Sequence, residues 1–471
     1  MKKLLSLVLA FYAISILAQT PELKISEKGE GSTHQVLVTS PGLFGLGFES
    51  NLNYGATIWY DLVNDPESKN CITKSKSGFI TKSSQGALIN QVLMPYDLIA
   101  HISSSYHKKI PHSVEIVEKG SARIVIRNKF RPLFSHKMAE NLFFQTAYTI
   151  YPTGRIYIKS TLTGLKDCTI NLWRNSTITM PDPSYNPMGI DSGTATEVKD
   201  GKGFIDSTKK WKKDRWKGHC LSLPKWTTYE IEGNNETTLF IGKRLSGRTP
   251  LGKGKYTIIS HRKKHGWLRA DSVHNPYSWH RDPAEFLFMY WDKSTPAPFT
   301  NWTQASIMLT PRPSNPKQGG GAGLHGWKGT KRLYYQHGKF ELAKDASVVQ
   351  FYMIQLGTEN SEYLPNIRTK KVGAEYSNDY RTPATVDNGK FDWENGCYIV
   401  KSGELNFKVG GIERIKPAFQ IDKWSGSDTA SVSLNGKALA IGKDFISAKE
   451  KETMIVQLLI NIKADSKIII K

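Results

Sequence analysis

The feature that most constrains the fold is a series of short runs rich in β-branched residues, bounded by Gly, Pro, Asn or Lys. Several runs alternate apolar and polar residues, which is the period of a strand with one buried face. Such runs cover residues 36–39, 113–117, 122–127, 155–160, 456–460 and 467–470. Few windows show helical periodicity, so the sequence predicts a mainly β protein built as a sandwich or a larger double sheet.

Turn-rich segments divide this strand pattern into regions. We expect residues 19–355 to form a main β domain, into which a compact β module is inserted at about 200–245. Residues 356–403 are rich in Asn, Asp, Gly and Tyr, so we expect a connecting segment there. The strand pattern returns at residues 404–471, which predicts a C-terminal β domain of the sandwich type.

The first residues have the pattern of a secretory signal peptide. Lys2 and Lys3 give a charged start, residues 4–17 are mainly apolar, and Ala18 is a small residue at a cleavage site. We therefore predict a signal peptide at residues 1–18 and a periplasmic or secreted protein. No later stretch approaches the ~18 apolar residues of a membrane-spanning helix, so we expect no membrane span.

Basic residues strongly outnumber acidic ones. The chain has 64 Lys and Arg against 42 Asp and Glu, a formal net charge of +22. A field of this sign concentrates polyanions near the surface. Export argues against nucleic acid, and no nucleic-acid-binding motif is present. We expect an acidic extracellular glycan as partner and a monomeric protein; the alternative is that the charge only promotes solubility.

The four cysteines are widely spaced, at Cys71, Cys168, Cys220 and Cys397. They form no CxxC pair and no zinc-ligand spacing with His. Four cysteines allow three disulfide pairings in an oxidising compartment, and the sequence does not choose among them.

A basic and aromatic run covers residues 261–282 and shows neither helical nor strand periodicity, so we predict a long surface loop. It contains four His, three Arg, two Lys, two Trp, one Tyr and one Asn. Cations bind carboxylates and sulfates, aromatic rings give flat faces for sugars, and His and Tyr transfer protons. This mixture is typical of a site for an acidic polysaccharide; the alternative interpretation is a solvated basic loop.

A second cluster follows the Pro- and Gly-rich run 311–323, which we predict to be a loop. If residues 330–337 form a strand, Tyr334 and Tyr335 face opposite sides, so at most one reaches a given site. The substrate-binding candidates of both clusters are His261, Arg262, His265, Trp267, Arg269, Trp279, His325, Arg332, Tyr334 and His337.

Two stretches resemble known proteins. Residues 147–158, AYTIYPTGRIYI, predict a hairpin in which a Pro-Thr-Gly turn joins two strands. This hairpin resembles one in the galactose-mutarotase-like β-supersandwich proteins, which include sugar-active enzymes and the β domains of several polysaccharide lyases. Residues 204–239 look like a small β module common in secreted polysaccharide-degrading proteins; we interpret its Trp211 and Trp216 as core rather than as a sugar platform.

The resemblance implies a large antiparallel β-supersandwich with a small inserted β module and a C-terminal β-sandwich-like region, of polysaccharide-lyase or glycosidase type. The helical toroid that accompanies the β domain in many such lyases is absent from the sequence. No catalytic residue is therefore carried over from that family.

The residues of the 261–282 loop fit β-elimination from a uronate-containing, sulfated or unsulfated glycan such as a glycosaminoglycan. This reaction removes the proton beside the carboxylate and expels the 4-linked sugar, and the charge that develops must be neutralised. We assign Asn275 and Arg281 to the carboxylate, His274 or His280 to the base, and Tyr277 to the acid/base role. For each residue, the alternative is a buried or bystander position in the loop.

Two other functions remain open. The same loop could hold a glycan without cleaving it, and a glycoside hydrolase would need two carboxylates, for which no diagnostic pair is present. The serine-hydrolase elbow and the metalloprotease HExxH motif are absent. The acidic run at residues 387–392 carries oxygen ligands suited to calcium, but it departs from the EF-hand spacing. A plain turn is the favoured interpretation, and we expect no cofactor and no metal.

Overall fold

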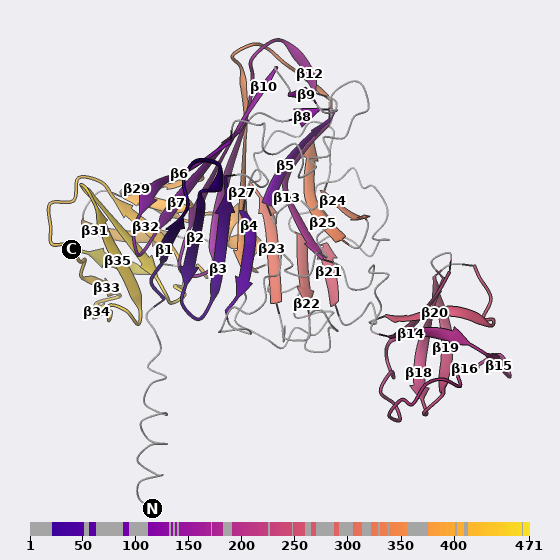
Figure 1. The fold of residues 1–471 in the computed structure, drawn as a ribbon. Helices are drawn as coiled ribbons and strands as arrows, with labels where there is room; N and C mark the ends of the chain where they lie inside the picture. The colour runs from indigo at the N-terminus through magenta and orange to yellow at the C-terminus, as the bar shows by residue number, and fades with distance from the viewer. Residues whose placement is uncertain are drawn as a thin grey trace, which may run out of the picture.

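In the computed structural model the described strands form three β bodies, which follow one another across the molecule in Figure 1. The described residues are 21–50, 56–62, 88–93, 112–130, 133–134, 137–138, 141–170, 172–181, 191–224, 227–246, 248–259, 265–269, 287–291, 305–312, 322–327, 330–337, 339–356, 375–400, 403–408, 413–463 and 465–471. The predicted signal peptide lies outside these ranges. Within them, no helix is long and apolar enough to cross a membrane.

Within the described residues, the largest sheet has eight antiparallel strands in the order β21-β22-β23-β27-β11-β10-β7-β6. Its strands are β6 (His112–Lys119), β7 (Ile124–Phe130), β10 (Leu142–Ile150), β11 (Arg155–Gly164), β21 (His265–Arg269), β22 (Leu287–Trp291), β23 (Ala305–Pro311) and β27 (Ser347–Leu356). Three of these strands coincide with the predicted runs at 113–117, 122–127 and 155–160, where β-branched residues fit a pleated, buried surface.

The predicted hairpin at residues 147–158 is confirmed and lies at the centre of this sheet. It joins β10 to β11 through a turn in which the Tyr151 N–H donates to the Arg155 carbonyl oxygen at 2.9 Å. Gly154 closes the turn with φ of +79°, and a Cβ atom there would lie 2.5 Å from the carbonyl oxygen of Leu356. The turn therefore requires glycine, because any side chain would push β27 away from it.

A second layer consists of two four-stranded sheets, β1-β2-β3-β4 and β24-β25-β13-β5. Strand β4 lies next to β5, so the layer runs continuously from β1 to β24. Its strands are β1 (Lys24–Lys28), β2 (Gln35–Ser40), β3 (Phe44–Glu49), β4 (Ala56–Asp61), β5 (Leu88–Leu93), β13 (Leu172–Pro181), β24 (Ala322–Trp327) and β25 (Thr330–His337). Two layers of antiparallel strands of this size confirm the expected β-supersandwich.

Aromatic contacts between the layers fix how they are aligned. The Phe48 ring on β3 lies 5.1 Å from the Tyr148 ring on β10. Further along, the Tyr335 ring on β25 lies 5.7 Å from the Tyr352 ring on β27. All four side chains are buried in one core between the layers. The order of strands in the second layer, from β1 to β24, therefore runs in the same direction as the order from β6 to β21 in the first.

Short elements complete the described part of this body. They are η1 (Gly31–Thr33), β8 (Leu133–Phe134), β9 (Lys137–Met138), β12 (Cys168–Ile170) and β26 (Phe340–Leu342). Strands β8 and β9 pair with each other, and so do β12 and β26.

The inserted module is a seven-stranded, strongly curved sheet in the order β14-β20-β17-β18-β19-β16-β15. Its strands are β14 (Asp191–Ala195), β15 (Glu197–Lys199), β16 (Gly203–Ile205), β17 (Cys220–Leu223), β18 (Thr227–Asn234), β19 (Thr238–Ser246) and β20 (Gly254–Ile259). Trp211 and Trp216 are buried in its core, as the sequence predicted. The module spans residues 191–259, so it is wider than the expected 200–245. Strands β14 and β20 pair with each other at its two ends, and neither has a long apolar run that would predict it from the sequence.

The C-terminal body contains two five-stranded sheets, β28-β31-β37-β33-β34 and β29-β30-β32-β36-β35. Its strands are β28 (Thr385–Val386), β29 (Gly389–Asp392), β30 (Cys397–Val400), β31 (Gly403–Lys408), β32 (Ala418–Ile421), β33 (Val432–Leu434), β34 (Lys437–Ala438), β35 (Phe445–Glu450), β36 (Thr453–Leu458) and β37 (Lys467–Ile470). This body begins earlier than residue 404. A short helix at residues 375–381 and strands β28 to β30 occupy part of the expected connecting segment, because strands of two to four residues between tight turns leave no clear periodicity.

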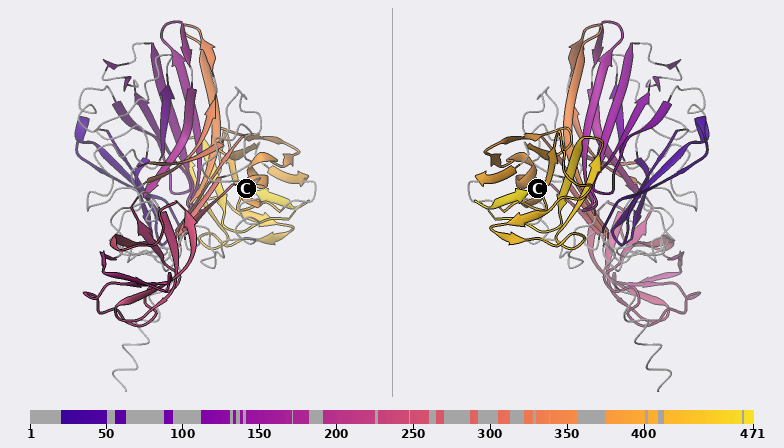
Figure 2. Two further views of the ribbon diagram at one scale, coloured as in Figure 1. Left: turned by 90° about the vertical axis from the view of Figure 1, so that its right-hand side faces the viewer. Right: turned by 90° about the vertical axis from the view of Figure 1, so that its left-hand side faces the viewer.

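The C-terminal body packs against the outer face of the large sheet, which lies between it and the β1–β4 sheet in the side views of Figure 2. A buried ion cluster joins the two. The Arg155 guanidinium on β11 donates to the Asp379 carboxylate at 2.7 Å, and Arg414 lies 3.5 Å from the same carboxylate. Each of the three side chains is at most 8 % exposed. Two buried cations thus share one buried anion at the junction of the two bodies.

The described cysteines Cys168, Cys220 and Cys397 form no disulfide with one another. Cys71 lies outside the described residues. Burial raises the pKa of the Cys397 thiol to about 12, which keeps it protonated and unreactive at neutral pH.

Candidate functional site

The predicted catalytic residues lie outside the described part of the chain, together with several predicted substrate contacts. This group comprises His261, Arg262, His274, Asn275, Tyr277, Trp279, His280 and Arg281. The other predicted contacts lie on described strands, for which the backbone and its register are available: His265, Trp267 and Arg269 on β21, His325 on β24, and Arg332, Tyr334 and His337 on β25.

Strand β21 corrects the expectation of a single loop over residues 261–282. Residues 265–269 pair with β22 along their whole length, with His265 opposite Trp291 and Arg269 opposite Leu287. The apolar partner strand supplies a pairing that the local sequence of β21 does not reveal. Positions 265, 267 and 269 belong to one face of β21, because every second residue of a strand shares a face.

The second cluster lies on two strands, β24 and β25, and their register orders its residues. On β24 and β25, His325 is the direct cross-strand partner of Arg332, and Gly323 is the partner of Tyr334. Tyr335 is 4 % exposed and belongs to the core between the layers. Strand alternation therefore assigns positions 332 and 334 to the face away from that core, and position 337 to the face of Tyr335. The register groups His325 with Arg332 and separates them from His337.

The two predicted clusters lie at the same end of the supersandwich. Among the described strands, β21 is the edge of the large sheet and β24 is the edge of the second layer. Because the two layers run in the same order, the edges β21 and β24 end on the same side, away from the C-terminal body in Figure 1. Segments separated by more than fifty residues in sequence are thus brought to one end of the fold. We call this region the β21–β24 end.

Arg312 is a candidate contact that the sequence reasoning missed. It directly follows β23 and stacks between two rings, with its guanidinium 5.3 Å from the Phe351 centroid and 4.6 Å from the Trp393 centroid. Within the described residues, its buried Nε has no hydrogen-bond partner. Trp393 belongs to the cluster between the large sheet and the C-terminal body, so Arg312 is a candidate contact at that junction and not at the β21–β24 end. The available signal was an Arg between Pro311 and Pro313, at the end of a strand and the start of a Gly-rich run.

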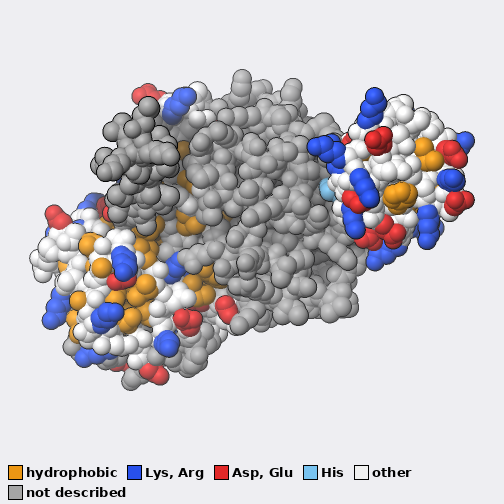
Figure 3. Space-filling view, turned by 90° about the horizontal axis from the view of Figure 1, so that it is seen from below, with side chains coloured by type: hydrophobic (Ala, Val, Ile, Leu, Met, Phe, Trp, Pro, Cys, Tyr) orange, Lys and Arg blue, Asp and Glu red, His pale blue; other side chains and the backbone are white. Residues whose placement is uncertain are grey.

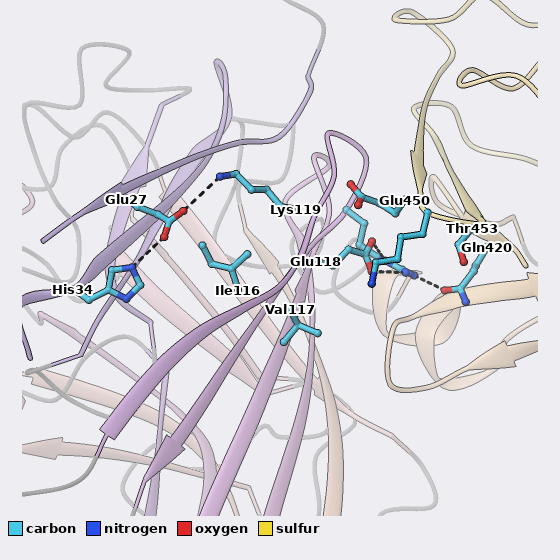
Figure 4. Close-up of a pocket in the computed structure, with 11 residues that line it drawn as sticks. Glu27, His34, Ile116, Val117, Glu118, Lys119, Gln420, Glu450 and Thr453 are labelled. Atoms are coloured by element: carbon cyan, nitrogen blue, oxygen red, sulfur yellow. Dashed lines mark hydrogen bonds and ion pairs between the residues drawn. The ribbon is translucent and has the colours of Figure 1, made fainter. Parts of the chain in front are cut away.

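A pocket of about 670 Å³ lies at the opposite edge of the supersandwich, where β1 and β6 approach the C-terminal body (Figure 4). In Figure 4, Glu27 and His34 form one wall, and Glu118, Glu450, Gln420 and Thr453 form the other. Its full lining is Glu27, His34, Ile116, Val117, Glu118, Lys119, Arg123, Gln420, Glu450, Lys451 and Thr453. We call it the junction pocket; none of the residues predicted from sequence lines it.

Two of the three carboxylates in the junction pocket form ion pairs. Glu118 receives two hydrogen bonds from the buried Arg123 guanidinium, each 2.7 Å long. Glu27 lies 3.2 Å from His34 Nε2 and 3.5 Å from Lys119 Nζ. Burial raises the pKa of Glu450, and the negative charge of Glu118 adds to this increase. The pocket is therefore close to electrically balanced, unlike the chain as a whole.

The balance of charges determines what the junction pocket can bind. Carboxylates, an amide and a hydroxyl can form hydrogen bonds with the hydroxyl groups of a neutral sugar. A polyanion would gain no net attraction there, because Glu27, Glu118 and Glu450 offset the cations of the lining. Sequence reasoning could not find this pocket, because its lining comes from segments more than four hundred residues apart.

The acidic run at residues 387–392 forms a turn followed by strand β29, which pairs with β30. Asp392 accepts hydrogen bonds from the Glu394 N–H at 2.9 Å and from the Asn395 side chain at 2.8 Å. These contacts within the chain engage both oxygens of its carboxylate. In the described ranges, no group of three or more His, Cys, Asp and Glu residues is arranged to hold a metal ion.

Comparisons with known proteins find similarity only at the level of the fold. No protein-family model and no curated protein matches the sequence. Among solved structures, galactose 1-epimerase from Lactobacillus acidophilus NCFM is 8 % identical, with a TM-score of 0.32, over 71 % of this chain and 98 % of that one. A heparan sulfate lyase HepC mutant from Pedobacter heparinus is 7 % identical, with a TM-score of 0.24, over 82 % of this chain and 40 % of that one.

A further match, described as a polysaccharide lyase, is 7 % identical with a TM-score of 0.25, over 95 % of this chain and 46 % of that one. Epimerases of the mutarotase type and polysaccharide lyases are also the proteins that the hairpin at 147–158 resembles. At these TM-scores the likeness carries no argument about chemistry. Function must therefore be argued from the residues of this chain.

Proposed function

We propose that this protein is an exported polysaccharide lyase that cleaves an acidic, uronate-containing glycan by β-elimination at the β21–β24 end. The observation that carries the proposal is the strand order, which brings β21 and β24 to the same end of the two layers. Residues 270–286, which include the proposed catalytic residues, connect β21 to β22 in the sequence. Without this convergence, the two basic clusters would be unrelated features of the sequence.

Charge supports an anionic substrate at this end. The net charge of +22 favours the approach of a polyanion. The cross-strand pair of His325 and Arg332, on the face of the second layer away from the core, and Arg269 on the edge strand of the large sheet would supply cations to the carboxylates or sulfates of a polymer that passes around this end. The junction pocket, in contrast, has a balanced charge and lies at the other edge, so it is not the site proposed for the acidic polymer.

The proposed reaction needs three roles, and the loop residues supply each of them. Asn275 and Arg281 bind the uronate carboxylate and stabilise the charge that develops on it. His274 or His280 removes the proton from C5, so that a double bond forms between C4 and C5 as the C4–O bond breaks. Tyr277 donates a proton to the departing glycosidic oxygen, which leaves as a hydroxyl group.

A panel assay tests this function. The mature protein is incubated with heparin, chondroitin, hyaluronan, alginate and ulvan, and the ultraviolet absorbance of unsaturated uronate is followed. An increase with at least one polymer is the expected result, and Tyr277→Phe should abolish the increase while polymer affinity stays nearly unchanged. A matched Lys24→Gln variant, on the exposed opposite edge, should retain the wild-type rate. A wild-type rate in Tyr277→Phe would remove Tyr277 from the mechanism.

Hydrolysis is the second candidate, because the junction pocket holds three carboxylates and burial raises the pKa of one of them, Glu450. A carboxyl that stays protonated longer than its neighbours suits a general acid. New reducing ends without unsaturated product, lost in Glu450→Gln, would support this function. Polymer retention without either product would indicate a glycan-binding protein.

A further inference from the structure

A rigid loop of the inserted module carries a dense set of cations. We call residues 209–218 the lysine loop. Trp211 and Trp216 anchor it in the module core. The backbone N–H of Trp216 donates to Asn234 Oδ1 at 2.7 Å, and Asn234 Nδ2 donates to the Lys212 carbonyl oxygen at 2.9 Å. Buried anchors and hydrogen bonds therefore fix the backbone of this loop before any ligand arrives.

The charged side chains of the lysine loop lie on the surface. The exposed cations are Lys210, Lys212, Lys213, Arg215 and Lys217. The one acidic residue among them, Asp214, has φ of +56° and turns the chain at the middle of the loop. The Arg215 guanidinium stacks on the Trp216 ring at 4.7 Å, which orients it. Cations on a fixed backbone bind a polyanion with a smaller ordering cost than cations on a mobile tail.

An exposed aromatic ring lies beside these cations. Phe240 on β19 is 45 % exposed and is the one aromatic among the exposed large hydrophobic side chains of the described residues. Its cross-strand partners are Gly203 and Gly233, so no side chain covers it from the paired positions. A Cβ atom at Gly233 would lie 2.7 Å from Asp214 Oδ1 and 3.6 Å from Phe240 Cδ2. Glycine at 233 thus lets the lysine loop and the Phe240 ring approach each other.

Covalent connection keeps this surface near the β21–β24 end. Strand β20 ends at Ile259 and β21 begins at His265, so residues 260–264 are the whole link. A chain of this length spans at most about 20 Å. The module surface in Figure 3 carries Lys and Arg side chains among Asp, Glu and hydrophobic ones. A polymer bound there would remain close to the edge strand that carries His265, Trp267 and Arg269.

We propose that the lysine loop and Phe240 form a docking surface for an acidic polysaccharide, separate from the cleavage site. The identity of the polymer as the substrate rests on the proposed function. Sulfates or carboxylates of the polymer pair with the lysines, and the apolar face of one sugar ring stacks on Phe240. The predicted export of the chain favours a polysaccharide over nucleic acid as the partner.

The test uses the full-length mature protein and two variants, K210Q/K212Q/K213Q and Phe240→Ala. Retention on an immobilised acidic polysaccharide, first heparin and then chondroitin sulfate, is measured over a range of salt concentrations. The triple variant should bind about tenfold more weakly and with a shallower salt dependence, because fewer counterions are released. Phe240→Ala should weaken binding without changing the salt dependence. Turnover of a short oligosaccharide should be unchanged in both.

Matched controls separate docking from net charge. The variant K423Q/K437Q/K443Q removes the same charge from exposed lysines of the C-terminal body, and Ile441→Ala removes an exposed apolar side chain there. Both controls should retain wild-type binding. Equal weakening in the two triple variants, or failure of the wild-type protein to be retained, would overturn the docking surface.

Further outcomes distinguish the two proposals. Equal retention of the wild-type protein on DNA and on polysaccharide of similar charge density would refute the polysaccharide as the specific partner. Retention that depends on the lysine loop, but with no unsaturated product from any polymer, would leave the docking surface intact and refute the lyase. Loss of short-oligosaccharide turnover in the triple variant would show that the lysine loop belongs to the cleavage site.

Discussion

The inserted module and the junction with the C-terminal body use cations in opposite ways. On the module, Lys210, Lys212 and Lys213 are exposed. At the junction, Arg155 and Arg414 are buried and share the carboxylate of Asp379. The basic residues of the chain therefore fall into two populations, one exposed and one buried. Only the exposed population can contact a polyanion.

The two populations also differ in what they contribute to folding. Exposed charges stay solvated, so neutralising them alters stability little. A buried cation has lost its hydration and depends on its partner, so removing that partner is costly. Basic residues thus serve binding on the module and hold two bodies together at the junction. Variants on the module should therefore change polymer binding, and variants at the junction should change stability.

The largest expected effect is at the junction. Asp379→Ala would leave Arg155 and Arg414 buried without their shared anion and should destabilise the protein by about 3–5 kcal/mol. Glu394→Ala is the control, because its pair with Lys159 is partly exposed and should contribute less than about 1 kcal/mol. Urea denaturation measures both variants. Equal losses would contradict the distinction between buried and exposed cations.

A smaller effect is expected where the module holds its lysine loop. Asn234 is buried and bonds to the Trp216 N–H and to two carbonyl oxygens, so Asn234→Ala should cost the module about 1–3 kcal/mol. Polymer retention should also fall, although every cation of the loop remains. Hydrogen exchange at residues 209–218 checks the loop, and unchanged exchange together with weaker binding would show that rigidity is not the cause.

The acid side of the pH profile should affect the module. Burial alone would raise the pKa of Asp191 and Asp206, but hydrogen bonds outweigh it: Lys209 and Trp211 lower the pKa of Asp191, and Thr208 and Tyr256 lower that of Asp206. Their stabilisation is present above the unfolded pKa of about 4 and is lost as the pH falls below it. Region-resolved hydrogen exchange should show the module opening first in acid.

At alkaline pH the junction should lose stability. Near neutral pH this is the smallest of the predicted effects. Burial raises the pKa of the Cys397 thiol and of the Tyr157 phenol, each to about 12. The protonated forms stabilise the folded state, so this contribution is full below the unfolded pKa values and is lost as the pH rises toward 12. Junction amides that keep their protection from exchange as the pH rises toward 12 would contradict this assignment.

Sequence patterns predicted the elements that carry strong local signals. The hairpin of β10 and β11 was identified because β-branched alternation and a Pro-Thr-Gly turn coincide there, and Trp211 and Trp216 were correctly assigned to the core. The edges of the module and of the C-terminal body were misplaced. Strands such as β14 and β28 are defined by their partners, and no periodicity develops within two to five residues.

The candidate site could be predicted only in part, because it too depends on the pairing of strands that are distant in the sequence. Residue types pointed to both basic clusters, but their convergence at one end depends on the order of strands in two layers, which no local pattern encodes. The sequence also did not reveal that Phe240 is exposed, because this residue lies between the buried Leu239 and Ile241 in an apolar run. Alternation requires such a run to expose one residue, and this was the available signal.

The rate of unsaturated-product release in Arg269→Gln and Arg332→Gln tests the central claim most directly. These positions lie on different layers: the register assigns position 269 to the side of the core between the layers and position 332 to the opposite face of its sheet, so a polymer must pass around the β21–β24 end to contact both. The account predicts that each variant loses about tenfold or more in kcat/KM on the polymer, whereas Lys24→Gln on the opposite edge retains the wild-type value. Wild-type kcat/KM in either arginine variant, or equal loss in Lys24→Gln, would contradict it.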